Sequence, residues 1–384
     1  MFKTDFFLKQ WLTDPFMKTY DRVDCFAPSR AGNLVPPRVF NTWPGFRAEK
    51  LPPIPDNEVE QLVAPILNHL RSVICNSDDL QHFHLACMAQ HVQDPATKSG
   101  VGLILMGEQG VGKDIISSWY VHDILGPDIA VASANMKHVF GDHSLLLQNK
   151  ILCLIDEADP ATVSKYLPSL KSAMTDKSSS FNPKGKNGFI TSNLCSFWFI
   201  TNMLSFPFDI SDRRFVALDC NNSKKNDTEY FDNLAVSLND RSARALFQYL
   251  QNYDISAHNN VSAKRPDTDI YRRLQQESIP LFYQFMSSQC LRNVDMEPIS
   301  NITASDMFQR LKLWANVNNF PMINPQTRIF YTSTSLGMDF TRLMAQAGSS
   351  VARTRTSRSL GYSLVWAELM TCLESRKLFD TEAV

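Results

Sequence analysis

The chain has 384 residues, more than the roughly 100–200 of one typical domain, so we expect two or three domains. Its composition, 44% hydrophobic and 20% charged, can fill a sizeable core and excludes a globally disordered chain. With 38 basic and 39 acidic side chains the net charge is −1, which excludes a generally basic protein that coats nucleic acid and confines any polyanion site to a local patch.

The cysteines and the apolar runs predict a protein that is neither exported nor bound to a membrane. The eight cysteines are scattered without a CxxC pair, which favours free thiols in a reducing compartment over disulfides or a zinc site. No apolar run approaches the ~18 residues of a membrane span, and the N-terminal sequence lacks the cleavage site of a signal peptide. We therefore expect a soluble, intracellular protein with no membrane partner.

The first two segments of the chain differ in their proline content. Residues 1–55 carry eight prolines, which exclude long helices and central strands and predict an arm laid over another part of the molecule. Residues 56–99 predict a helical region. Its first helix has Asp56 as the expected N-cap, and a second helix begins near Asp78.

The middle of the chain has a different pattern. Between residues 100 and 225, short apolar runs alternate with polar or helical pieces, which is typical of buried parallel strands joined by crossover helices. These runs are residues 102–106, 151–155, 197–200 and 215–218. The sequence therefore predicts an α/β fold with a parallel sheet in this segment.

Two further segments follow the predicted sheet. Residues 226–294 predict a helical extension, with helical periodicity that persists to about residue 319. Residues 295–384 read as helix, helix, hairpin and helix, an order that predicts a winged-helix-like domain.

A glycine-rich loop follows the first apolar run of the predicted sheet. A strand that ends in GxxxxGK and opens a helix is the phosphate-loop arrangement, in which backbone N–H groups surround the β-phosphate and the lysine reaches the β- and γ-phosphates. The alternative is a glycine-rich turn before an ordinary helix. The predicted ATP-binding residues are Gly107, Glu108, Gln109, Gly110, Val111, Gly112, Lys113 and Asp114.

Asp114 departs from this pattern, because the position after the lysine normally holds a Ser or Thr that ligates Mg²⁺. A carboxylate is also a good Mg²⁺ ligand, although it adds negative charge beside a triphosphate. Either Asp114 holds the metal, directly or through water, or metal binding depends on the acidic pair described next.

Two carboxylates, Asp156 and Glu157, follow the second apolar run directly. A buried strand that ends in this way places both acids at the carboxyl edge of the sheet, where ligands bind in open α/β folds. We expect Asp156 to hold Mg²⁺ and Glu157 to orient and deprotonate the attacking water. Taken alone, such a pair is more often a solvated strand end.

Polar and basic residues accompany the last two apolar runs. Asn202 lies two residues after the third run and can donate to the γ-phosphate or the attacking water; the alternative is the start of a turn. Arg213 and Arg214 precede the fourth run, and a guanidinium from a neighbouring subunit can neutralise charge on a transferring phosphoryl group. We take Arg214 as this finger and Arg213 as a secondary contact. The alternative is a surface ion pair between Asp212 and Arg213.

Together these motifs make the chain resemble a superfamily 3 helicase of the AAA+ class, and more narrowly the helicase portion of phage and virus primase–helicase proteins. The resemblance covers most of the chain, and Asp after the loop lysine also occurs in this branch. Related proteins commonly carry a primase–polymerase domain upstream, and nothing here resembles one. The matching stretches are VFNTWPGF (39–46), MAQHVQDPATKSGVGLILMGEQGVGKD (88–114), LKSAMTD (170–176), NPKGKNGFITSN (182–193), FWFITNM (197–203) and ISDRRFVALD (210–219).

The resemblance gives a role to the stretch from Phe181 to Phe189, which alone reads as a turn-rich hairpin tip, most often a solvated loop. In related helicases a hairpin here projects into the ring pore and grips DNA. Lys184 and Lys186 would contact phosphates, and Asn187 or Phe189 would touch sugar or base.

A second candidate DNA contact lies in the C-terminal segment. Arg353, Arg355 and Arg358 occur in the predicted wing hairpin without an acid between residues 351 and 360. The alternatives are a solvated edge strand and a contact between subunits.

The function that this resemblance implies is a ring-forming, ATP-driven DNA helicase in phage or virus replication, in the cytoplasm of the host cell. It implies hexamers with residues 56–99 as the collar, ATP and Mg²⁺ as cofactors, 3′→5′ movement on single-stranded or forked DNA, and a primase or primase–polymerase partner. The main alternative is a non-translocating AAA+ switch that loads or assembles a replication complex. A further alternative is a nucleotide-binding relic in which Asp114 has disabled metal binding.

Overall fold

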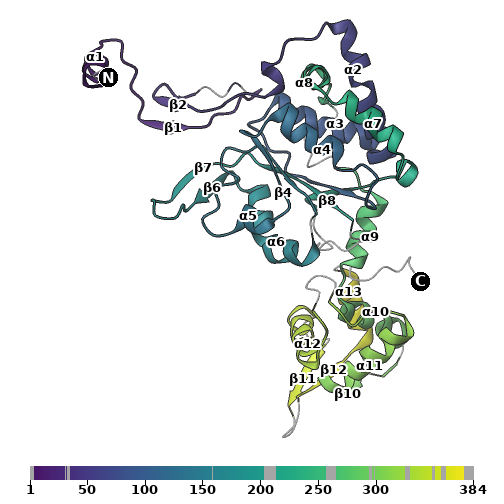
Figure 1. Cartoon of the computed structure of the whole chain (residues 1–384). Helices are drawn as coiled ribbons and strands as arrows, with labels where there is room; N and C mark the ends of the chain where they lie inside the picture. Colours follow the sequence, from purple (N-terminus) through teal and green to yellow (C-terminus); the bar gives the residue numbers. More distant parts are fainter. Residues whose placement is uncertain are drawn as a thin grey trace.

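The computed structural model describes residues 4–30, 32, 35–157, 159–202, 213–256, 265–293, 296–297, 299–324, 329–347, 351–355 and 360–375. A five-stranded parallel sheet forms the centre of the larger body (Figure 1). Its strands, in spatial order, are β4 (Ala130–Ser133), β5 (Leu152–Ile155), β8 (Ser196–Thr201), β3 (Gly102–Met106) and β9 (Phe215–Asp219). The predicted α/β fold with a parallel sheet is confirmed.

Four of these strands coincide with the predicted apolar runs, and β4 was not predicted. Strand β4 lies at the edge of the sheet and pairs only with β5. Of its residues only Ala130 is fully buried, so its sequence, AVAS, lacks the bulky apolar residues that mark the central strands.

The connections between strands place helices on both faces of the sheet. The chain leaves β3 through α4 (Ile115–Trp119) and the π-helical turn η3 (Tyr120–Leu125) and crosses to β4 at one edge. It then returns across the sheet through α5 (Met136–Phe140) and α6 (Pro160–Thr175). Because such crossovers are right-handed, the opposite directions of travel put α4 on one face and α5 and α6 on the other.

Alternate residues of the central strands belong to two separate cores. Leu103 and Leu105 of β3 pack in the core on the α4 side, whereas Ile104 and Met106 pack with α5 and α6. Both faces of the sheet are therefore covered, which explains why its strands are continuous apolar runs without alternation.

Helices that precede or follow the sheet strands along the chain pack on the same face of the sheet as α4. They are α2 (Asp56–His69), the π-helical turn η2 (Leu70–Cys75), α3 (Asp78–Gln93), α7 (Thr228–Ser237) and α8 (Asp240–Asn252). The expectation that Asp56 is an N-cap was wrong: Pro55 is the cap, and Asp56 is the first helical residue, where its charge favours the positive end of the helix dipole. Ser77 caps α3 by accepting a hydrogen bond from the N–H of Leu80.

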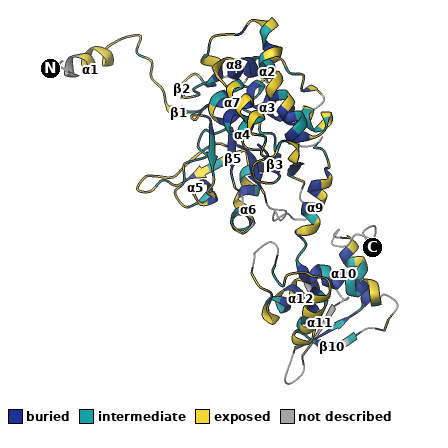
Figure 2. Ribbon diagram, turned by 45° about the vertical axis from the view of Figure 1, so that its right-hand side comes forward, coloured by how far each residue is buried: buried dark blue, intermediate teal, exposed yellow. Residues whose placement is uncertain are grey.

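The first part of the proline-rich N-terminal segment is an arm that reaches away from the larger body (Figure 1), and residues 25–28 return to it. It contains α1 (Thr4–Leu12), whose described side chains are exposed (Figure 2), and a parallel pair of short strands, β1 (Arg22–Asp24) and β2 (Val39–Asn41). Its end is anchored to the body, because Phe46 is buried against Phe247 and the short helix η1 (Ala48–Lys50) follows.

A smaller body with its own core follows α9 (Asp269–Glu277), which packs on the sheet. It has the antiparallel strand order β10-β12-β11 and, among its described residues, four helices. The strand β10 interrupts the region where helical periodicity was expected to persist to residue 319. The elements are α10 (Leu281–Asn293), β10 (Ile299–Thr303), α11 (Ala304–Val317), α12 (Ser333–Ala347), β11 (Val351–Arg355), β12 (Leu360–Leu364) and α13 (Trp366–Ser375).

Two further expectations concern cysteines and membranes. All eight cysteines are free thiols, as predicted, and seven of them are buried. No helix in the described part of the chain has the length and the hydropathy that a membrane crossing requires.

Candidate functional site

The carboxyl edge of the sheet has a crevice between β3 and β8. These strands are neighbours, but the strand that follows β3 in the chain is β4 at one edge of the sheet, and the sheet strand that follows β8 is β9 at the other edge. Open α/β sheets bind ligands at such a switch point. The glycine-rich loop follows β3, Asn202 follows β8, and Asp156 follows the adjacent β5. The structure therefore brings the predicted loop, amide and acids to one edge.

The loop from Gly107 to Asp114 is held in a conformation that requires glycine. Gly110 and Gly112 have φ values of +83° and +84°, in the left-handed region that other residues rarely adopt. A Cβ atom on Gly112 would also collide with the ring of Phe231 in α7 unless that ring moved. The Lys113 ammonium donates to the carbonyl oxygen of Glu108 at 3.0 Å and thus folds back across the loop.

His69, at the end of α2, ties this loop to the helical layer. Its Nε2 lies 3.0 Å from the carbonyl oxygen of Gly112, and its Nδ1 lies 2.9 Å from the hydroxyl of Tyr230. Burial lowers the pKa of His69, which favours the neutral ring. The two contacts then assign the tautomer: Nε2–H donates to Gly112 and Nδ1 accepts from Tyr230. Sequence reasoning missed His69, because no local pattern connects it with a residue 43 positions away.

Glu108 connects the loop to the chain that follows β9. Its carboxylate accepts from Asn222 Nδ2 at 2.7 Å and forms an ion pair with Lys225. The hydrogen bond from Lys225, followed by that from Asn222, lowers the pKa of Glu108. The two partners lie at and just after the short helix η4 (Asn222–Lys224), which has no motif that predicts a site.

A cavity of about 480 Å³ opens at this edge of the sheet, within the range of roughly 300–1,000 Å³ of small-molecule sites. Three of its lining residues, Gly107, Glu108 and Asn202, were predicted as site residues. The sequence did not indicate the residues of its other wall, Asn76, Asp219, Cys220, Asn221 and Asn222.

The two acids lie beside this crevice in different environments. Asp156 is half-buried, and its Oδ1 accepts from the N–H of Glu157 at 2.9 Å. Glu157 is exposed and has a φ of +50°, which is uncommon for a residue other than glycine. Asp114 is exposed at the start of α4 and caps no N–H group.

In the described part of the chain, no three His, Cys, Asp or Glu residues are grouped as a metal centre. Metal binding by Asp156 and Asp114 stays a prediction that rests on their chemistry, because carboxylate oxygens are ligands of the kind that Mg²⁺ takes.

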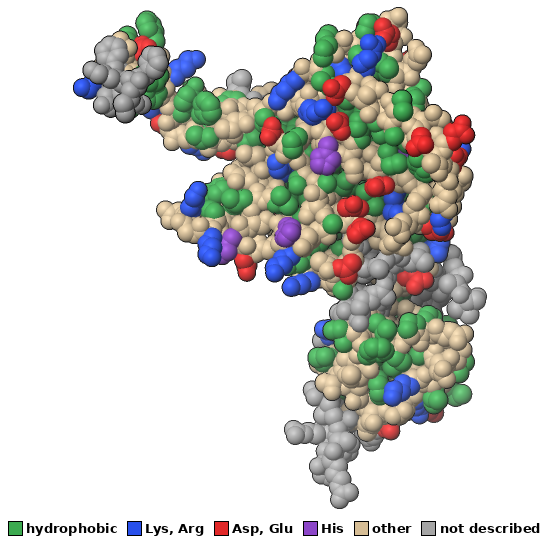
Figure 3. Space-filling model, viewed as in Figure 1, with side chains coloured by type: hydrophobic (Ala, Val, Ile, Leu, Met, Phe, Trp, Pro, Cys, Tyr) green, Lys and Arg blue, Asp and Glu red, His purple; other side chains and the backbone are tan. Residues whose placement is uncertain are grey.

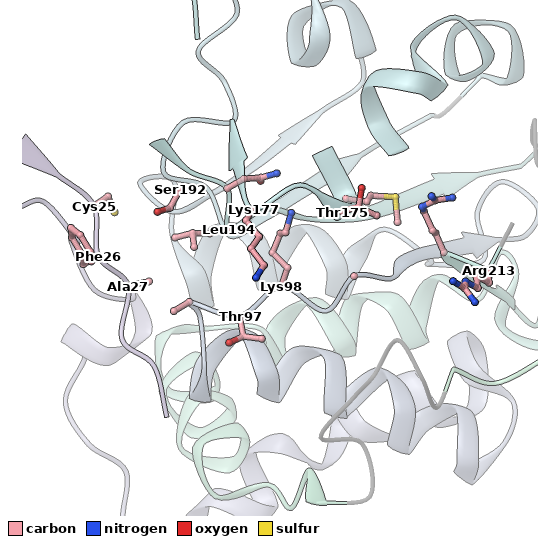
Figure 4. A pocket seen from close by; sticks show the side chains of 15 residues that line it. Cys25, Phe26, Ala27, Thr97, Lys98, Thr175, Lys177, Ser192, Leu194 and Arg213 are labelled. Atoms are coloured by element: carbon pink, nitrogen blue, oxygen red, sulfur yellow. The ribbon is translucent and has the colours of Figure 1, made fainter. Parts of the chain in front are cut away.

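The arginines do not join this group within one chain. The carbonyl oxygen of Arg214 accepts from the N–H of Gly102, the first residue of β3, at 2.7 Å. Arg213 and Arg214 therefore lie at the amino edge of the sheet, separated from the loop by the five residues of β3, or about 15 Å. They line a second cavity, shown in Figure 4. Asp212 lies outside the described residues.

The predicted hairpin is confirmed. Strands β6 (Ser178–Phe181) and β7 (Phe189–Ser192) pair antiparallel, and the rings of Phe181 and Phe189 close the pair with centroids 5.6 Å apart. Lys184, Lys186 and Asn187 are exposed at the tip. Figure 3 shows basic side chains along the side of the body that carries this hairpin, α5 and α6, and acidic side chains on the opposite side.

The structure describes only part of the three arginines that were predicted as DNA contacts in the C-terminal body. Arg353 and Arg355 lie on β11, an edge strand that pairs with β12. Arg358 lies outside the described residues, as do the side chains of the other two arginines.

Comparisons with known proteins give a family of unknown function and a phage DNA primase-polymerase. Residues 105–214 match the model of a family of unknown function (DUF5906). A DNA primase-polymerase of Nitratiruptor phage NrS-1 is 29% identical over 178 residues, which are 44% of this chain and 24% of that protein. The match thus spans about a quarter of that relative.

Among solved structures, the chain is similar to the A form of the apo C-terminal region of NrS-1. The sequence identity is 16%, the TM-score is 0.53, and the match covers 89% of this chain and 84% of that chain. This similarity shows a common fold. Another apo structure of the same region matches with 15% identity, the same coverage and a TM-score of 0.47.

Proposed function

We propose that this chain is an ATP-driven DNA helicase of the superfamily 3, AAA+ type that acts in phage genome replication. The observation that carries the proposal is the convergence of the GxxxxGK loop, Asp156, Glu157 and Asn202 on one switch-point crevice, while the arginines lie at the opposite edge. The similarity to the C-terminal region of a phage DNA primase-polymerase supports the setting in replication.

The phosphates of ATP would bind where the loop after β3 meets the start of α4. The N–H groups of the loop and the Lys113 ammonium supply the positive charge, once Lys113 exchanges the Glu108 carbonyl for phosphate oxygens. Mg²⁺, when held by Asp156 and Asp114, would neutralise phosphate charge. Glu157 accepts the proton of the attacking water, and Asn202 donates a hydrogen bond to the γ-phosphate.

The arginines require a second copy of the chain. Because Arg213 and Arg214 lie at the amino edge, they reach the phosphates only at the crevice of an adjoining copy. Contacts of this head-to-tail kind close into a ring when the rotation between copies allows it. We propose a hexamer, in which Arg214 acts as the finger and Arg213 as a secondary contact.

The exposed hairpin would hold the DNA. Lys184 and Lys186 at its tip contact phosphates of a single strand in the pore, with Asn187 or Phe189 against sugar or base. Arg353, Arg355 and Arg358 are a further proposed contact. We expect movement to be 3′→5′ and a primase or primase–polymerase to be the partner.

The decisive experiment is strand displacement on forked duplexes with a 3′ or a 5′ loading strand, with and without ATP. We expect ATP-dependent displacement that requires the 3′ loading strand, and no displacement by the Lys113→Ala variant. ATP hydrolysis without displacement on either fork would overturn the helicase and favour the non-translocating switch.

A further inference from the structure

A second cavity, of about 690 Å³, lies at the amino edge of the sheet, away from the crevice (Figure 4). Its lining contains four basic side chains, Lys98, Lys177, Arg213 and Arg214, and no acidic one among the described residues. On a chain with a net charge of −1, this is a local excess of positive charge.

The walls of this cavity are fixed by hydrogen bonds. The Lys98 ammonium donates to the carbonyl oxygens of Ala173, at 3.0 Å, and Asp176, at the end of α6. Asn193 Nδ2 donates to the same two oxygens at 2.7 and 3.0 Å. The loop before β3, the end of α6 and the chain after β7 are thereby held together.

The N-terminal arm forms another wall and brings an aromatic ring to the cavity. Asn41 accepts from the N–H of Phe26 at 2.8 Å and donates to its carbonyl at 3.0 Å, and Ala96 N–H donates to the Pro28 carbonyl at 3.2 Å. These bonds hold Phe26, which is half-buried, in the cavity lining.

One of these basic side chains has no acidic partner in the described part of the chain. Lys177 is exposed and forms no ion pair with a described residue. The nearby Asp176 carboxylate is hydrogen-bonded to Ser172. Burial lowers the pKa of Lys98, so an anion beside it would be favourable.

We propose that this cavity binds the sugar-phosphate backbone of single-stranded DNA, with Lys177 on a phosphate and Phe26 stacked on a base. Basic side chains beside an aromatic ring are the usual platform for a single strand. The site is also continuous with the hairpin, because Lys177 immediately precedes β6, and Ser192 and Asn193 end and follow β7. The inference rests on the proposed DNA binding by that hairpin and adds a second anchor at its base.

The experiment measures binding of a labelled oligo-dT strand by fluorescence anisotropy as a function of salt. Lys177→Ala should reduce the slope of log K against log[salt] by about 0.7, the contribution of one phosphate contact in single strands. Lys177→Arg should keep the slope, and so should the control Lys165→Ala, an exposed lysine on α6 outside the cavity. Phe26→Leu should weaken binding roughly five- to 150-fold without changing the slope. An unchanged slope for Lys177→Ala would overturn the proposal.

Two further results distinguish this proposal from the alternatives. If the cavity instead receives the phosphates of a nucleotide on an adjoining copy, Lys177→Ala will lower ATP hydrolysis without DNA and leave the salt slope intact, and the proposal is wrong. If Lys184→Ala/Lys186→Ala reduces the slope and Lys177→Ala does not, only the second anchor fails. Absence of DNA binding by the wild-type protein would overturn the proposed function as well.

Discussion

Glu157 adopts a backbone conformation that L-residues rarely occupy, immediately after the buried strand β5. Its φ is +50°, and its N–H is bonded to the carboxylate of Asp156 at 2.9 Å. Such a conformation costs about 1–3 kcal/mol and is concentrated at functional sites. Because the strain falls on the residue that the sequence predicts as the base, Glu157 is the first side chain to test.

The Glu157→Gln variant should bind ATP but hydrolyse it about 10²–10⁴-fold more slowly, because an amide cannot accept the proton of the attacking water. Phosphate release measures the turnover, and a fluorescent ATP analogue measures the binding. The control is Glu229→Gln, which changes an exposed glutamate in the first turn of α7. Hydrolysis at the wild-type rate would remove Glu157 from the role of base.

The role of Asp114 can be tested by its dependence on Mg²⁺. If its carboxylate replaces the usual hydroxyl, Asp114→Ser should retain hydrolysis. Asp114→Ala should raise the Mg²⁺ concentration for half-maximal hydrolysis by at least the roughly tenfold change that the loss of an outer-shell partner produces. The affinity of Asp114→Ala for ATP in the absence of Mg²⁺ should change less than this Mg²⁺ dependence. Full activity of Asp114→Ala across the Mg²⁺ titration would show that Asp114 does not serve the metal.

At the scale of elements, helix α3 is buried from Phe83 to Val92 and places two histidines against β8. The rings of His84 and His91 lie 5.2 and 5.7 Å from that of Trp198. Burial lowers the pKa of His84 to about 4, and burial with the neighbouring His84 lowers the pKa of His91 to about 3. Both rings are therefore neutral in the folded protein.

These histidines should make the larger body sensitive to acid. Below pH 6.5 the unfolded chain binds protons that the folded chain does not, so the free energy of unfolding falls by about 1.4 kcal/mol per pH unit for each histidine. Above pH 6.5 these rings are neutral in both the folded and the unfolded chain, so they no longer lower the free energy of unfolding. Between pH 6.5 and 5, the free energy of unfolding of the His91→Leu variant should therefore fall by about 2 kcal/mol less than that of the wild-type protein, as measured by urea unfolding.

The control for this prediction is His138→Leu, which changes an exposed histidine on α5. It should leave the pH dependence of the wild-type protein unchanged. Equal pH dependence in His91→Leu and the wild-type protein would show that the buried ring is not the source of the acid sensitivity.

The hairpin is an element whose function can be separated from hydrolysis. It lies outside the crevice, so Lys184→Ala/Lys186→Ala should lose DNA-stimulated hydrolysis and unwinding while basal hydrolysis persists. The salt slope of single-strand binding should fall by about 1.4, or 0.7 for each lysine. Lys137→Ala, on the neighbouring α5, is the matched control. Unwinding at the wild-type rate by the double variant would exclude the hairpin as the DNA grip.

At the scale of the whole molecule, the parallel sheet separates the two halves of the proposed ATP site. The loop and acids lie at its carboxyl edge, and Arg214 lies at its amino edge. If both halves belong to one site, they can meet only between two copies arranged head to tail. The completed site would exist only between two copies.

Mixing two inactive variants tests this arrangement. Arg214→Ala should bind DNA but hydrolyse ATP about 10³-fold more slowly, as expected for the loss of an arginine finger. Mixed with Glu157→Gln, it forms some interfaces that contain both Glu157 and Arg214, so hydrolysis should partly return. If rings are shown to be mixed and no ratio restores hydrolysis, the site is not shared.

Features encoded by neighbouring residues were predictable from the sequence. Strands β3, β5, β8 and β9 were predicted because each is a run of apolar residues that needs no distant partner to be recognised. The hairpin of β6 and β7 was predicted from its turn residues and flanking aromatics. Strands β4 and β10 were missed, since their short, mixed sequences become strands only when a neighbouring strand completes their hydrogen bonds.

The placement of these features in space was decided by the tertiary structure alone. The contact between His69 and Gly112 joins residues 43 positions apart, and no periodicity predicts it. The separation of Arg214 from the loop follows from the parallel pairing of β3 and β9, and the basic cavity at the amino edge gathers five distant segments. Local patterns determine the central strands, the glycine-rich loop and the hairpin turn, because these depend on backbone preference and on continuous apolar runs. Which of them meet depends on strand order and on the direction of each crossover, and these are settled only when the whole core packs.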